Sequence, residues 1–246
     1  MSFINTQLKI ALLAMILLLS GCATTQQQAA GVNDPLEGYN RAMFAANGLL
    51  DKVILKPVTT VYDTILPPPI NQGITNFFSN LNEISVIFND LAQFKFQQAW
   101  EDTGRFLLNT TVGVVGIFDI ATMAGLEKNH EDFGQTLAVW GVDSGAYLIL
   151  PIFGPSSTRD VFRFATYAYT DPVGYIDDVP LRNRLWGLNF IDHRAALLGA
   201  DNVLEEAALD KYAYVREAYL QYRENLVYDG NPPESEEDEE FDVFED

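Results

Sequence analysis

The chain has 246 residues, of which 48% are hydrophobic and 12% aromatic, enough for one large domain or two small ones with a packed core. Its formal net charge of −19 argues against nucleic acid as a partner and against polybasic attachment to anionic lipid, because both need basic patches. Ten of the 34 acidic residues lie in 229–246, which contains no Lys or Arg, so the rest of the chain is only mildly acidic.

The first 21 residues are organised as a bacterial signal peptide. Lys9 and the amino terminus give a weak positive region, residues 10–19 are almost wholly aliphatic, and small residues follow up to Cys22. Residues 19–22, LSGC, are similar to a lipobox, which predicts signal cleavage between Gly21 and Cys22 and acylation of the cysteine. The alternative is an ordinary secretory signal in which Cys22 lies near the cut by chance.

Cys22 is the only cysteine, so a disulfide within the chain is excluded and stability must come from the core. Stable membrane attachment takes about two acyl chains, which a lipidated Cys22 would provide. Residues 22–33 are small and polar, and they are predicted to form a lipidated tether that reaches at most roughly 40 Å. Ala23 follows the cysteine where lipoproteins of the inner membrane have Asp, and this resemblance favours the outer membrane.

Residues 34–228 are predicted to form one helical domain. Asp34 and Glu37 have the spacing of a capping box, and the helix that they open is expected to end before Pro57. A second, shorter helix is expected to stop at the three prolines of 67–69.

Apolar residues recur at helical spacing over 70–94, and a break near 80–82 is left open. A further helix follows Lys95 and runs into the first of two segments, 106–120 and 137–153, that are apolar on nearly every side. Glycine and Asp residues interrupt both segments short of the roughly 18–20 residues that a spanning helix needs, so neither is predicted to cross a bilayer. A buried core is the simpler interpretation, and an apolar surface or passage in contact with lipid is the alternative.

Gly113 and Gly116 interrupt the first apolar segment and cost helix stability, roughly 1 kcal/mol each relative to alanine. They predict close packing of the backbone or a break in the helix, and they are the candidate positions for close packing or for a lipid path. Residues 147–153 have the composition of a short strand. Because no partner strand is visible in the sequence, an extended or irregular chain is expected there.

Capping patterns at Asp132, and at Ser157 with Asp160, each precede a stretch of helical composition. Four helices are predicted in the second half of the domain, from Asp132 to Trp140, from Ser157 to Tyr169, and over 188–198 and 210–227. The prolines and high charge of 229–246 predict a disordered acidic tail. The predicted fold class is all-α, with a single multi-helix domain.

Familiar catalytic motifs are absent from the sequence. It contains no HExxH, CxxC, GxSxG or phosphate-binding glycine loop, and only two histidines. The consecutive residues His, Glu and Asp at 130–132 point to different sides of any helix, so a solvated loop is expected there rather than a metal site. Ser156 or Ser157 with His193 is the remaining candidate for nucleophilic catalysis. No cofactor or metal site is predicted, and the chain is not expected to be an enzyme.

Two sets of charged residues have two interpretations each. Arg105, Arg159 and Asp160 either contact lipid headgroups or form ion pairs and caps. The acidic tail either steers a basic soluble partner by long-range attraction, which salt would screen, or only improves solubility.

Several groups of residues follow one another in an order and spacing typical of one family. They are DPLEGYNR at 34–41, NFF and NL within 76–81, RF and NTT within 105–111, Gly113 with Gly116, EDFGQTL at 131–137, and the stretch from LP at 150 to RD at 160. Together with the lipobox, these residues resemble the MlaA/VacJ family of outer-membrane lipoproteins from Cys22 to about Tyr228. Ile84 and Ala146 stand where the family usually has proline, and the acidic tail lies outside the shared pattern.

The resemblance implies a non-enzymatic role in phospholipid traffic. It implies a helical ring embedded in one membrane leaflet, which removes mislocalised phospholipids from the outer leaflet of the outer membrane and so maintains lipid asymmetry. The implied partners are the phospholipid, a trimeric porin and the periplasmic lipid carrier MlaC. The alternatives are a porin-associated structural lipoprotein and a lipid-anchored hydrolase that uses Ser156 or Ser157 with His193.

Overall fold

The computed structural model describes residues 34–207 and 209–233. The predicted signal peptide, its cleavage site at Gly21 and Cys22, the lipidated tether and the acidic tail from residue 234 onward lie outside these residues and stay predictions.

The described residues are mostly helical, as predicted. The first half contains α2 (Glu37–Leu50), a π-helical turn (Asp51–Leu55), α3 (Lys56–Ile65), α4 (Pro68–Ala92), α5 (Phe96–Thr111) and α6 (Ile120–Met123). The second half contains α7 (Phe133–Val139), β1 (Tyr147–Leu150), β2 (Gly154–Ser157), α8 (Phe162–Thr170), a 3₁₀ turn (Pro172–Tyr175), α9 (Val179–Ala196), α10 (Leu198–Ala207) and α11 (Lys211–Val227). The all-α class is confirmed, with one short hairpin added.

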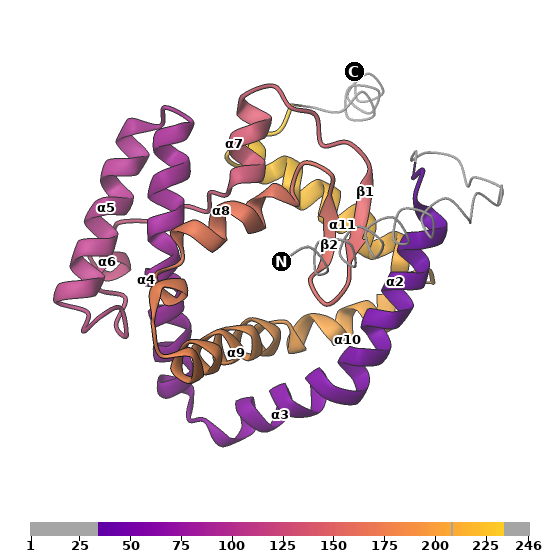
Figure 1. The fold of residues 1–246 in the computed structure, drawn as a ribbon, viewed down its shortest axis with the longest axis horizontal. Coiled ribbons are helices and arrows are strands. Elements are labelled where there is room, and N and C mark those ends of the chain that lie inside the picture. The colour runs from indigo at the N-terminus through magenta and orange to yellow at the C-terminus, as the bar shows by residue number, and fades with distance from the viewer. Residues whose placement is uncertain (1–33, 208, 234–246) are drawn as a thin grey trace, which may run out of the picture.

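The helices are arranged as a ring-like frame when the molecule is viewed down its shortest axis (Figure 1). Helices α2 and α3 form two sides, α4 forms a third, and α8 and α11 lie along the fourth. Helices α9 and α10 run across the frame, where α9 packs against both α3 and α4. Helix α5, which packs against α4, and the short α6 lie outside the frame. The predicted ring of helices is therefore confirmed.

The first helix does not end before Pro57, and that prediction is wrong. The chain stays helical from Glu37 to Ile65 because a π-helical turn precedes the proline. In that turn the N–H of Lys56 donates to the carbonyl oxygen of Asp51, five residues back, and Pro57 follows with no N–H to satisfy. The predicted stop at residues 67–69 is correct, since α3 ends at Ile65 and α4 begins at Pro68.

Asp34 does not form the predicted capping box. The cap position of α2 is Leu36, which makes no side-chain cap bond. Asp34 Oδ1 accepts from the Leu36 N–H and from Asn40 Nδ2, each at 3.2 Å, and its Oδ2 accepts from the Tyr212 hydroxyl and the Arg216 guanidinium. Asp34 therefore ties the start of α2 to α11, using one carboxylate oxygen for each.

Residues 147–153 were expected to be extended or irregular because no partner strand was visible; residues 147–150 are extended, but they do have a partner strand. Tyr147 pairs with Ser157 and Leu150 with Gly154 in an antiparallel hairpin. The partner strand has the sequence GPSS, whose residues are poor strand formers, so composition could not reveal it. The N–H of Asp160 does donate to Ser157 Oγ at 3.1 Å, but this bond lies between β2 and α8 and does not cap a helix.

The small apolar core lies where the hairpin meets α2 and α11. Tyr147, Ile149 and Tyr212 are buried there, with Met43 and Phe44 packed against them. The side chain of Asn40 in α2 replaces a third strand: its Nδ2 donates to the Tyr147 carbonyl at 3.0 Å, and its Oδ1 accepts from the Ile149 N–H at 2.8 Å. One edge of β1 is therefore covered by a helix.

The remaining helices differ in extent from the predictions. No break occurs near residues 80–82, since α4 is continuous. Asp132 caps α7 as predicted, accepting the Gln135 N–H at 3.0 Å. Helix α9 begins nine residues before the predicted start at 188, because Asp178 caps it and Pro180 fits its first turn. Helix α10 was not predicted as a separate element.

Candidate functional site

The described part of the chain has an unusual distribution of polar and apolar side chains. Only eight hydrophobic residues are buried in it, compared with 21 polar or charged ones. In water-soluble domains the most buried side chains are hydrophobic, and Asp, Glu, Lys and Arg are almost never fully buried unless they are paired. The interior of this molecule is therefore held by polar contacts, and its apolar side chains face outward.

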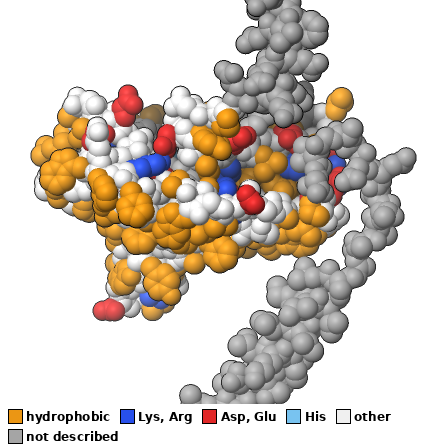
Figure 2. Space-filling view, turned by 90° about the horizontal axis from the view of Figure 1, so that it is seen from above, with side chains coloured by type: hydrophobic (Ala, Val, Ile, Leu, Met, Phe, Trp, Pro, Cys, Tyr) orange, Lys and Arg blue, Asp and Glu red, His pale blue; other side chains and the backbone are white. Residues whose placement is uncertain are grey.

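The two apolar segments of the sequence lie largely on this outer surface. Their exposed large hydrophobic residues are Leu107, Val112, Val114, Val115, Ile117, Phe118, Val139, Trp140, Val142, Ile152 and Phe153. The simpler interpretation, a buried core, is therefore wrong for most of both segments. Figure 2 shows hydrophobic side chains gathered along one border and one end of the flat molecule, while charged side chains lie mainly on the opposite border.

Such a broad apolar surface marks contact with a membrane or a protein partner. Trp100 on α5 and Phe94 before it are among its most exposed members, at 77% and 73%. None of the described helices combines the length and hydropathy that a bilayer-crossing segment requires.

Arg105 holds α5 to α4 in the interior. Its guanidinium lies 3.4 Å from the carboxylates of Glu83 and Asp119 and donates to Thr122 Oγ1 at 3.2 Å. Glu83 also forms an ion pair with Lys128, whose Nζ lies 2.7 Å from Glu83 Oε1. Of the two interpretations of Arg105, the ion pair is correct, and the side chain is too deeply buried to reach a headgroup.

A second buried cluster joins α11 to α7 and to the start of α8. Arg223 donates to both carboxylate oxygens of Asp132 and, at 3.1 Å, to Oδ1 of Asp160. Asp160 also accepts from Arg159 at 3.1 Å and from the Tyr219 hydroxyl at 2.7 Å. These cations hold the pKa of Asp160 below its usual range although burial opposes this. Arg159 and Asp160 therefore form an ion pair.

Glu131 is not in a solvated loop, and that prediction is wrong for this residue. It is 5% exposed and accepts from Lys95 Nζ at 2.7 Å and from Gln93 Nε2 at 2.7 Å. Asp132 is used in the α7 cap and the Arg223 pair, whereas His130 is exposed. No group of three or more His, Cys, Asp or Glu side chains within 34–207 and 209–233 is placed to hold a metal ion.

Two acidic side chains face each other between α4 and α5. Asp90 and Asp102 are both fully buried; Asp90 accepts from Gln98 at 2.8 Å and Asp102 from Asn129 at 3.1 Å. The second oxygen of each carboxyl group, Oδ2 of Asp90 and Oδ1 of Asp102, accepts no hydrogen bond from any other described residue. Burial, and then the hydrogen bond between the two carboxyl groups, raises the pKa of Asp90 to about 8. Glu131 adds to this rise, so the pair shares one proton at neutral pH.

This proton makes the stability of the fold dependent on pH. Because the pKa of Asp90 is raised on folding, its contribution is complete below about pH 4 and is lost as the pH rises toward about 8. As the pH rises across this window, the original protein should lose this contribution and Asp90→Asn should not. The difference in the free energy of unfolding should therefore shift in favour of Asp90→Asn by up to about 1.4 kcal/mol per pH unit. Denaturation at pH 5 and pH 8 measures the difference. Equal pH dependence of the two proteins would contradict it, and Asp143→Asn, at an exposed carboxylate, is the control.

Gly113 and Gly116 shape the loop that follows α5. A side chain at Gly113 would lie 2.2 Å from the carbonyl oxygen of Phe118, and one at Gly116, whose φ is +88°, would meet the side chain of Asn80 at 2.4 Å. Between them Val114 and Val115 have φ values of 55° and 57°, which β-branched residues rarely adopt. Strain of this kind persists only where the surrounding contacts fix it, and it is frequent at functional sites.

The serine candidates for catalysis are not brought together with a histidine. Ser156 and Ser157 are completely buried in β2, and Ser157 Oγ accepts the Asp160 N–H. His193 is exposed on α9. Within the described residues no hydrogen bond links either serine to His193.

The sequence did not indicate the Asp90–Asp102 pair or the role of Arg223. One signal was available: Asp90 interrupts the apolar repeat of α4 between Phe88 and Leu91. A charge in such a position predicts a polar contact between helices, but its partner lies in another helix and cannot be read from the repeat.

Comparison with known proteins identifies the family. A model of the family described as MlaA lipoprotein matches residues 32–226, which is most of the chain. The chain belongs to the MlaA lipoprotein family. The resemblance inferred from the motifs at 34–41, 131–137 and 150–160 is thereby confirmed.

Relatives within the MlaA family carry a common description. The intermembrane phospholipid transport system lipoprotein MlaA of Shigella flexneri is 36% identical over 217 residues, which cover 87% of this chain and 85% of the relative. The protein of the same description from Escherichia coli strain K12 is 35% identical with the same coverage. That of Haemophilus influenzae is 33% identical and covers 92% of each chain.

A solved structure shares the MlaA fold. It superposes with a TM-score of 0.69 at 35% sequence identity, covering 80% of this chain and all of the other, and it is described as the structural basis for maintenance of bacterial outer membrane lipid asymmetry. The apolar exterior and polar interior described above therefore belong to a fold that is already associated with a lipid membrane.

Proposed function

We propose that this protein is an outer-membrane lipoprotein that removes mislocalised phospholipids from the outer leaflet and passes them to a soluble periplasmic carrier. The observation that carries the proposal is the inverted distribution of side chains in a member of the MlaA lipoprotein family. Relatives of similar length are described as intermembrane phospholipid transport lipoproteins.

The flat shape fits a position within one leaflet. The apolar border would contact acyl chains, which removes exposed apolar area from water at about 25 cal/mol per Å². The charged border would face the aqueous side (Figure 2). Burying an unpaired charge is very costly, so a moving headgroup needs polar groups along its route.

Attachment at the periplasmic face would come from acylated Cys22 through the tether 22–33. The family resemblance also supports two protein partners, the carrier MlaC and a trimeric porin. A purely structural role beside a porin is the second candidate, because Trp100 and Phe94 expose aromatic rings suited to a protein interface as well as to lipid.

Loss of the gene in the source bacterium tests the transport proposal. We expect the deletion to raise the phospholipid content of the outer leaflet and the sensitivity to detergent, and the original gene to restore both. Cys22→Ala should fail to restore them because the protein would leave the membrane. Unchanged surface lipid in the deletion strain would contradict the proposal.

Measuring the phospholipid bound to the purified protein distinguishes the transport role from the structural role beside a porin. Solvent extraction of protein purified in mild detergent should yield bound phospholipid if the protein transports it. A stable porin complex that yields no phospholipid would favour the structural role.

A further inference from the structure

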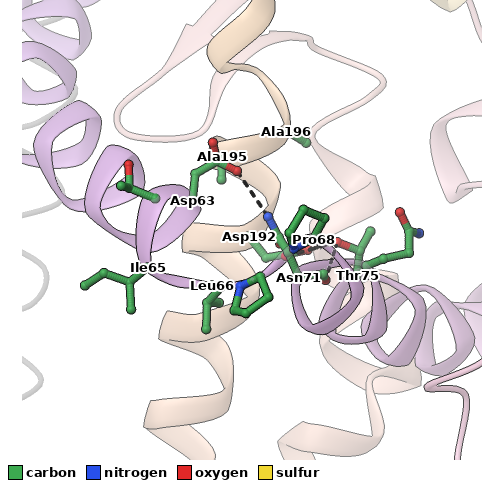
Figure 3. A pocket seen from close by; sticks show the side chains of 12 residues that line it. Asp63, Ile65, Leu66, Pro68, Asn71, Thr75, Asp192, Ala195 and Ala196 are labelled. Atoms are coloured by element: carbon green, nitrogen blue, oxygen red, sulfur yellow. Dashed lines mark hydrogen bonds between the residues drawn. The ribbon is translucent and has the colours of Figure 1, made fainter.

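A polar cavity lies at the corner of the frame where α3, α4 and α9 meet. Its volume is about 560 Å³, and its walls come from the end of α3, the proline turn at 66–68, the first two turns of α4 and the last turns of α9. Figure 3 shows side chains from all three helices arranged around it. The turn keeps α3 and α4 apart at this point, because Leu66 and Pro67 each precede a proline and are extended before α4 begins at Pro68.

The deepest group in this cavity is the carboxylate of Asp192. It is 4% exposed and accepts from the Tyr62 hydroxyl at 2.8 Å and from the Thr75 hydroxyl, whose oxygen lies 3.0 Å from both carboxylate oxygens. Both of these donors are neutral. Within the part of the chain that the structure describes, no Lys or Arg forms an ion pair with Asp192, although a buried carboxylate normally has a cationic partner.

A second carboxylate lies at the mouth of the cavity. Asp63 is exposed, and its Oδ1 accepts the side-chain amide of Asn71 at 3.2 Å, as the dashed line in Figure 3 marks. Asp63 also forms no ion pair within 34–207 and 209–233. The cavity therefore presents two carboxylates and amide and hydroxyl oxygens, and it lacks a cation. The group that fits such a set of acceptors is an ammonium, which carries a positive charge and three N–H donors.

The surface that leads to the cavity is apolar. Val58, Val61 and Ile65 are exposed and lie at helical spacing on one side of α3. Ile65 is 71% exposed and also lines the cavity. A ligand that places a cation in the cavity and apolar chains along this stripe is an amphiphile. A lysine side chain of a protein partner would use the carboxylates but would leave the stripe uncovered.

We propose that this cavity binds the primary ammonium of a zwitterionic phospholipid headgroup, such as that of phosphatidylethanolamine, while the acyl chains lie along α3. This inference rests on the proposed transport of phospholipid and names the headgroup that the protein prefers. The phosphate would remain at the open side, because no cationic residue lines the cavity. Anionic lipids, such as phosphatidylglycerol, would be repelled by Asp63 and Asp192.

Lipid binding to the full-length protein in detergent tests this preference. Native mass spectrometry with dioleoyl phosphatidylethanolamine and dioleoyl phosphatidylglycerol compares two headgroups on identical chains. We expect the ethanolamine lipid to bind about tenfold more tightly, equivalent to about 1.4 kcal/mol. Asp63→Asn and Asp192→Asn should each reduce this ratio toward one. Asp177→Asn, at an exposed carboxylate outside the cavity, should leave it unchanged.

The outcomes separate the inference from the proposed function. Equal binding of the two lipids, or a preference that survives both cavity substitutions, would overturn the headgroup site while leaving phospholipid transport intact. Failure to bind either lipid would overturn both. Asp63 is exposed, so its substitution keeps the test valid even if Asp192→Asn does not fold.

Discussion

Arg223→Met is expected to lower the free energy of unfolding by about 3–5 kcal/mol. Arg223 is 3% exposed and pairs with the carboxylates of Asp132 and Asp160. Methionine keeps much of the side-chain volume but removes the charge. It therefore leaves Asp160, which is fully buried, with Arg159 as its only cation among the described residues. Denaturation in detergent, followed by the fluorescence of the three tryptophans, measures the loss.

Arg41→Met is the matched control for this substitution. Arg41 also pairs with two carboxylates, those of Glu37 and Asp210, but its side chain is 43% exposed. Exposed ion pairs contribute about 0–1 kcal/mol, so this variant should be nearly as stable as the original protein. Similar losses in the two variants would show that the buried cluster contributes no more than a surface pair.

The second large effect is expected for Gly113→Ala. The added methyl group would lie 2.2 Å from the Phe118 carbonyl oxygen and 2.5 Å from that of Asn109. Both are backbone atoms, so the loop that presents Val114 and Val115 must shift. Overpacking costs typically about 1–3 kcal/mol, and we expect a loss at the upper end of this range. If the loop takes part in the lipid path, as its glycines suggested from the sequence, lipid export from the outer leaflet falls as well.

Gly48→Ala in α2 supplies the comparison. No atom lies within 4 Å of the added methyl group at that position, and alanine favours the helix by about 0.5–1 kcal/mol. This variant should be slightly more stable than the original protein. If Gly113→Ala were equally harmless, the close contacts of the loop would not constrain its shape. Surface lipid content in cells that carry each variant separates the effect on transport from that on stability.

The helical class and the family could be predicted because both depend on local pattern. Apolar spacing defined α4 and α5, Asp132 marked the start of α7, and the motifs from 34–41 to 150–160 were sufficient to identify the family. Local pattern failed where a distant partner decided the conformation. Asp34 uses one carboxylate oxygen for α11, which no local pattern indicates, and the GPSS strand forms only because β1 lies beside it.

The sequence alone determined the helical periodicity, the prediction of a lipidated Cys22 and membership of the MlaA family. Only the tertiary structure decided which side of each element faces outward. A helix that is apolar on all sides fits either a protein core or lipid, so its sequence pattern does not distinguish the two environments. The elements that pack around it in the fold decide which one it meets. Arg105 in α5 pairs with Glu83 in α4, and Asp192 accepts a hydrogen bond from Tyr62, which is 130 residues away in the sequence. These contacts turn the polar side chains inward and leave the apolar ones on the surface.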